Sequence, residues 1–171
     1  MKFIIPKIIC NINGYKLVKF KLNNRNIFPL IYVKKPKKPI VAFKKFYGIL
    51  IDDLFYRLSK EEQISAVWHE IYHTKSSTGI KLFFWLPFKK IFFKELRQYN
   101  LNQLEEFDAD RYASIKTSYV SVLGLLNKLN SFEKQGLIIS NLKNHPSIKD
   151  RILNIKSLYN QSCHSNSPHQ H

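Results

Sequence analysis

Short runs of alternating hydrophobic and polar residues fill the first third of the chain. Residues 15–22, "YKLVKFKL", alternate loosely between apolar side chains and lysines, as a strand with one buried face does. Further apolar runs follow at residues 27–35, 40–45 and 47–52, and the breaker "PKKP" (36–39) separates the first two of these. The pattern predicts a small N-terminal antiparallel sheet.

The spacing of apolar residues becomes helical after Ser59. In "SKEE", Ser59 lies three residues before Glu62, which is the arrangement of a capping box at a helix start. Val67, Trp68 and Ile71 then recur at helical spacing. These features predict a helix that begins at Ser59 and ends before "SSTG".

The same reasoning predicts three further helices, at residues 102–116, 118–132 and 145–159. Pro146 suits the first turn of the last helix, and the polar residues 160–171 are expected to form a disordered tail. Strands followed by helices indicate an α+β fold, with residues 1–159 as one domain.

Charge and cysteine content indicate which partners and which redox compartment suit the protein. The chain of 171 residues carries 28 Lys and Arg against 12 Asp and Glu, a net charge of +16. Such a charge attracts anionic partners, although lysines spread over solvated faces would give the same total. Cys10 and Cys163, the two cysteines, provide neither a disulfide framework nor a cysteine-based zinc site. A reducing compartment fits this usage.

No apolar window reaches the roughly 18 residues that a membrane span needs, and the first residues lack a signal-peptide cleavage pattern. We therefore expect a cytoplasmic protein. The apolar segment 80–93 has two alternatives: it packs against the core, or it lies in the headgroup layer as a peripheral membrane contact.

The stretch "VWHEIYH" (67–73) falls on the first predicted helix. His69 and His73 are four residues apart, so they share one helix face and can reach the same ion. Glu70 is offset by one residue and can hold a water on that ion without binding it, as in zinc peptidases. The alternative is a chance match of polar residues on a helix. Two of the six histidines of the chain lie here, which favours zinc (Zn2+).

A catalytic zinc site needs a third protein ligand, and no third histidine follows at a suitable spacing. The segment "LEEFDADRYA" holds four acidic residues, which are Glu105, Glu106, Asp108 and Asp110. Glu106 and Asp110 are four apart and share a face, so Glu106 can bind the metal while Asp110 orients a histidine. The alternative is a solvated acidic face.

HEIYH followed by Glu106-Phe-Asp-Ala-Asp110 resembles the HExxH…ExxAD signature of the HtpX-type heat-shock and CAAX prenyl endopeptidases, a branch of the gluzincins. "NHPSIKDRI" (144–152) is similar to the later His-Pro…Arg-Ile segment of that family. Residues 41–62 are similar to the strands and the short helix that lead into its active-site helix. The likeness covers residues 27–159 in consistent order.

The resemblance implies a metalloendopeptidase, a hydrolase that cuts polypeptide substrates with a zinc cofactor. It implies that His69, His73 and Glu106 bind zinc and that Glu70 is the general base and acid.

The resemblance also implies roles for residues outside the two motifs. His145 would stabilise the oxyanion, Asp110 would support the ligands, and Arg151 would be a structural partner of Asp110. The strand at Ala42 and Phe43 would pair with an extended substrate.

Two alternatives to an active peptidase remain open. The first is a latent or inactive zinc-binding gluzincin-like protein, in which a terminal segment blocks the site. The second is a basic protein that associates with acidic membrane or nucleic acid, although no sequence-specific nucleic-acid motif is present. The sequence leaves the substrate and the oligomeric state open.

Overall fold

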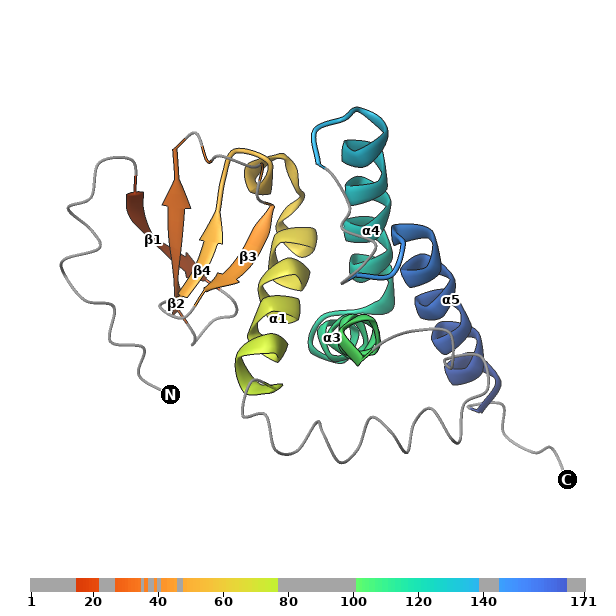
Figure 1. Cartoon of the computed structure of the whole chain (residues 1–171). Coiled ribbons are helices and arrows are strands. Elements are labelled where there is room, and N and C mark those ends of the chain that lie inside the picture. The colour runs from red at the N-terminus through yellow and green to blue at the C-terminus, as the bar shows by residue number, and fades with distance from the viewer. Residues whose placement is uncertain are drawn as a thin grey trace, which may run out of the picture.

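A computed structural model describes residues 15–21, 27–34, 36, 39, 41–45, 48–76, 101–138 and 145–165. Within these ranges strands come first and helices follow, so the α+β prediction is confirmed (Figure 1). The elements are β1 (Tyr15–Lys21), β2 (Ile27–Val33), β3 (Ala42–Lys45), β4 (Gly48–Ile51), the 3-10 turn η2 (Phe55–Arg57), α1 (Lys60–Ser76), α3 (Leu101–Lys116), α4 (Tyr119–Lys134) and α5 (Ile148–Ser165).

The four strands form one mixed sheet in the order β1-β2-β4-β3. The pairs β1–β2 and β3–β4 are antiparallel, as expected. The pair β2–β4 is parallel, so the prediction of a fully antiparallel sheet was wrong. The physical reason is the order of pairing: β4, rather than β3, lies beside β2, and β4 runs in the same direction as β2. This order places β3 at an edge of the sheet.

Two apolar clusters fix α1 between the sheet and the other helices. The first joins one face of the sheet to α1 and α4, and its buried members include Phe20, Leu30, Ile51, Phe55, Val67, Ile71, Leu125 and Phe132. The second joins α3, α4 and α5 through Ala113, Val122, Leu126, Ile148 and Ile155. Trp68 of α1 packs against both clusters. Helix α1, which carries the HEIYH stretch, is therefore held on both sides.

The start of α1 has the predicted capping box. The Ser59 backbone N–H donates to Glu62 Oε2 over 2.8 Å, and the Glu62 N–H donates to Ser59 Oγ over 3.3 Å. The helix begins at Lys60 and ends at Ser76, one residue beyond the expected end. Two backbone N–H groups at the helix start are therefore satisfied, which stabilises the first turn of α1.

Helix α5 differs from the prediction at both ends. It begins at Ile148 rather than at residue 145, because Ser147 Oγ accepts the Asp150 backbone N–H over 3.1 Å and caps the helix. Pro146 therefore precedes the cap. The helix continues to Ser165, so residues 160–165 are helical rather than disordered. No glycine or proline interrupts the chain before Pro168, which allows the extra turns.

Two earlier expectations fall outside the described residues: the contacts of the apolar segment 80–93 and the end of the tail, residues 166–171. Within the part of the chain that the structure describes, no helix has both the length and the apolar character that crossing a bilayer requires.

Candidate metal centre

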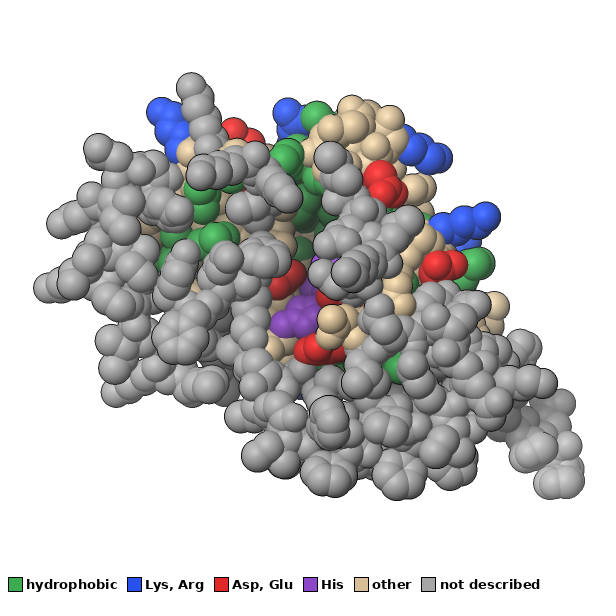
Figure 2. Space-filling model, viewed as in Figure 1, with side chains coloured by type: hydrophobic (Ala, Val, Ile, Leu, Met, Phe, Trp, Pro, Cys, Tyr) green, Lys and Arg blue, Asp and Glu red, His purple; other side chains and the backbone are tan. Residues whose placement is uncertain are grey.

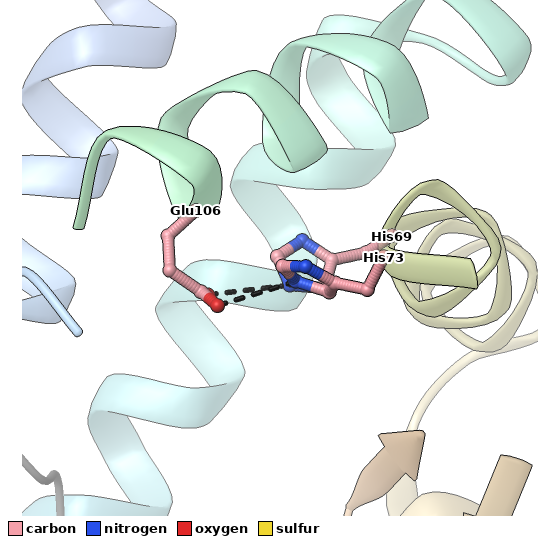
Figure 3. Close-up of side chains that lie close together, drawn as sticks. All are labelled: His69, His73 and Glu106. Atoms are coloured by element: carbon pink, nitrogen blue, oxygen red, sulfur yellow. Dashed lines mark hydrogen bonds and ion pairs between the residues drawn. The ribbon is translucent and has the colours of Figure 1, made fainter. Parts of the chain in front are cut away.

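Two helices bring the three predicted ligands together. His69 and His73 project from one face of α1, and Glu106 projects toward them from α3 (Figure 3). Glu106 Oε2 lies 3.3 Å from His69 Nε2, and Glu106 Oε1 lies 3.2 Å from His73 Nε2. The two histidine Nε2 atoms are 3.2 Å apart. His69 and Glu106 are buried and His73 is half-buried.

These separations suit a tetrahedral metal ion. Ligand atoms about 2.1 Å from a tetrahedral zinc lie roughly 3.4 Å from one another. The three distances above, between 3.2 and 3.3 Å, are close to that value. Two imidazole nitrogens and one carboxylate are also the donor set of hydrolytic zinc sites, which keep one position open for water. The residues present therefore fit zinc in both chemistry and spacing.

The predicted supporting pair, Asp110 and Arg151, lies directly behind His69. His69 Nδ1 and Asp110 Oδ1 are 2.9 Å apart. Arg151 Nε donates to Asp110 Oδ2 over 2.7 Å, and Arg151 Nη2 donates to Oδ1 over 2.6 Å. Arg151 Nη1 also lies 3.4 Å from Glu106 Oε2. A single guanidinium from α5 thus contacts both buried carboxylates of α3.

Burial and mutual charge both shift the pKa values in this cluster. Burial alone would lower the pKa of His69, but hydrogen bonds to Asp110 and Glu106 outweigh it and raise that pKa to about 10. Burial alone would raise the pKa of Glu106, yet its hydrogen bonds to His145, His69 and His73 lower it well below the usual range. The pKa of Asp110 is lowered against its burial by the charge of Arg151. Both carboxylates are therefore ionised, as metal binding and histidine support require.

Of the two residues predicted to act on substrate, His145 lies in direct contact with the cluster. His145 precedes α5, and its Nδ1 is 3.1 Å from Glu106 Oε1, while 45% of its side-chain surface is exposed. Glu70 directly follows His69 in α1, and it is half-buried. Burial alone would lower the pKa of Arg151, but the charge and hydrogen bonds of Asp110, followed by the charges of Glu106 and Glu70, outweigh it and raise that pKa. The His145 ring is thus accessible to solvent beside the Glu106 carboxylate.

The predicted substrate strand lies apart from this cluster in the sequence but beside α1 in the fold. Ala42 and Phe43 belong to β3, the edge strand of the sheet that packs against α1 (Figure 1). Their register is set by pairing with Ile51 and Leu50 of β4. The sheet edge and the HEIYH helix are therefore neighbours.

One contact was missed by the sequence reasoning. Glu105, treated there as one of four candidate ligands, lies with Oε1 3.2 Å from His73 Nδ1, on the opposite side of the ring from Glu106. The signal was present: each ligand histidine has a second ring nitrogen that needs a partner, but a single supporting acid, Asp110, had been predicted for the two histidines.

Histidine side chains are visible at the surface in the space-filling view, with acidic side chains immediately around them (Figure 2).

Comparisons with known proteins found no relative: no family model, no curated protein and no solved structure matches the chain. Inferences about function therefore depend on the residues and their geometry.

Proposed function

We propose that the protein is a zinc-dependent endopeptidase of the gluzincin type. The observation that supports this most strongly is the convergence of His69 Nε2, His73 Nε2 and the Glu106 carboxylate at tetrahedral spacing. The open position of such a site is where water and a carbonyl oxygen would bind. Glu70, next to the first histidine, is the group expected to handle protons there.

Each protein group would have a distinct task in hydrolysis. Zinc, when bound, would lower the pKa of a water molecule toward about 7 and polarise the scissile carbonyl. Glu70 would take the proton of that water and pass it to the leaving amine. His145 would donate a hydrogen bond to the oxyanion from its partly exposed ring.

The supporting residues and the sheet edge would position these groups. Asp110 holds the His69 ring through Nδ1, which leaves Nε2 free to bind the metal. Arg151 in turn holds Asp110 with two hydrogen bonds. An extended polypeptide substrate would lie along β3, with Ala42 and Phe43 beside it, and gain backbone hydrogen bonds from this edge strand.

The test combines metal analysis with one conservative variant. Wild type and Glu70→Gln are expected to carry one zinc per chain by elemental analysis, and His69→Ala is expected to carry none. In a casein or peptide-library assay, Glu70→Gln should lose about 10²–10⁴-fold in turnover, since the general base is gone. Wild-type turnover in Glu70→Gln would refute the mechanism. A zinc-loaded wild type that cuts no peptide would instead favour the latent zinc-binding alternative.

A further inference from the structure

Glu105 and Glu106 are adjacent on α3, yet they contact opposite nitrogens of the same histidine. His73 Nε2 lies 3.2 Å from Glu106 Oε1, and His73 Nδ1 lies 3.2 Å from Glu105 Oε1. The Glu105 side chain is 24% exposed, so this contact is partly shielded from water. The imidazole ring is thus placed between two consecutive side chains of one helix.

Hydrogen-bond chemistry assigns the proton on His73. A neutral imidazole has one N–H and one lone pair, and a carboxylate oxygen can only accept. A metal ion at Nε2 requires the lone pair there, so the proton must be on Nδ1 and is donated to Glu105. A carboxylate at this second nitrogen fixes the ring orientation and increases the electron density available to the metal.

The same arrangement occurs at the other histidine. His69 Nδ1 lies 2.9 Å from Asp110 Oδ1, and its Nε2 faces Glu106. The two histidines are thus matched: in each, Nε2 faces the Glu106 carboxylate and Nδ1 faces a further acidic residue of α3. Asp110 is fully buried and bound by Arg151, whereas Glu105 is half-buried at the rim of the cluster.

We infer that Glu105 is a positioning residue for zinc: it holds His73 in the Nδ1–H tautomer with Nε2 aimed at the metal. This inference rests on the proposed zinc centre and adds to it a residue outside the expected signature. It predicts that zinc affinity depends on Glu105 although Glu105 does not bind the ion.

The experiment measures zinc binding alone. Metal-free wild type, Glu105→Ala and Glu105→Gln are titrated with zinc against a chromophoric chelator at neutral pH. The Ala variant should bind zinc about tenfold to a hundredfold more weakly than wild type, the usual effect of removing such a support. The Gln variant should lose less, because its amide oxygen still accepts the Nδ1–H. Glu61→Gln, an exposed acid in the first turn of α1, removes the same charge away from the site and should change little.

Two further readouts separate positioning from folding. Circular dichroism and the urea midpoint of the metal-free proteins show whether each variant is folded. Cobalt-loaded Glu105→Ala should have an altered visible absorption spectrum, since the bound His73 ring would lose the contact at Nδ1 that fixes its orientation, and Glu105→Gln should restore most of the wild-type spectrum. Zinc affinity of Glu105→Ala within twofold of wild type, or equal losses in the Ala and Gln variants, would overturn the inference.

Peptide cleavage is a separate outcome. A wild-type chain that binds zinc in a Glu105-dependent way but cuts no peptide would leave this inference standing and refute the endopeptidase. A wild-type chain that binds no zinc would overturn both.

Discussion

Replacing Arg151 by methionine tests how far the buried charges behind His69 hold the fold together. Arg151 and Asp110 are both buried and share two short hydrogen bonds. Methionine fills much of the same volume, so the change removes the charge without leaving a large cavity. Asp110 would then remain fully buried, with His69 as its one other hydrogen-bond partner in the described contacts.

The expected cost follows from these contacts. Removing one partner of a buried ion pair typically destabilises a protein by about 3–5 kcal/mol, because the other charge stays buried and uncompensated. We expect the lower end, about 3 kcal/mol, since the pKa of His69 is raised in the metal-free protein and its imidazolium can supply part of the lost positive charge beside Asp110. Against a total stability of about 5–15 kcal/mol for a protein domain, this is a large fraction.

Urea unfolding of the metal-free proteins, followed by circular dichroism, measures this loss. With a slope of about 1–3 kcal/mol per molar urea, the Arg151→Met midpoint should fall by roughly 1–3 M. Lys149→Met, an exposed cation on the same helix, is the matched control and should stay within about 0.5 kcal/mol of wild type. A loss below about 1 kcal/mol in Arg151→Met would show that the ion pair is not needed and refute the reasoning.

The pH dependence provides a second check on the same pair. The pKa of Asp110 is lowered in the folded protein, so its pairing contributes stability above the ordinary carboxyl pKa of about 3.9. This contribution is lost as the pH falls through the folded pKa, because the carboxylate becomes protonated. The gap between wild type and Arg151→Met should therefore narrow below about pH 4. A gap that stays constant down to the acid limit would contradict the assignment.

Three further changes test other parts of the structure. Ser59→Ala removes one of the two hydrogen bonds of the capping box and should lower the free energy of unfolding in urea by about 1 kcal/mol. An unchanged free energy of unfolding would show that α1 needs no cap. Gly124→Val should cost about 1–3 kcal/mol, because a Cβ at Gly124 would lie 3.1 Å from Glu62 Oε1 and the larger side chain would displace Glu62; a stabilised variant would contradict this contact. His145→Ala should lower peptide turnover by about 10²–10³-fold with zinc content unchanged, and undiminished turnover would remove His145 from the mechanism.

Local signals in the sequence predicted the helices well. Ser59 and Glu62 form the expected box, and Ser118 caps α4 by accepting the Ser121 backbone N–H. Residues four apart on a helix share a face, and this rule alone placed Glu106 and Asp110 together. The convergence of these two with His69 needed only that α1 and α3 pack side by side, which they do.

Long-range arrangement was harder to obtain from the sequence. Each strand pattern fits either direction, so nothing local in "IFPLIYV" indicates that Leu30 pairs with Ile49 of β4 in parallel. The contact of Arg151 with Asp110 spans 41 residues and depends on where α5 packs, so it came from a family resemblance rather than from spacing. The role of Glu105 was missed because helical spacing shows which residues share a face but not which ring nitrogen each one reaches.

Glu105, Glu106 and Asp110 of α3 all contact histidines of α1. Together these contacts fix how α3 is rotated about its own axis relative to α1. Successive residues of an α-helix are rotated by about 100° around its axis. Deleting one residue between Glu106 and Asp110 would swing Asp110 away from His69 and Arg151 while Glu106 stayed in place. Length changes inside these two turns are therefore far less tolerable than amino-acid replacements, and natural variants of this chain should keep the interval from Glu105 to Asp110 at constant length even where the residues between them differ.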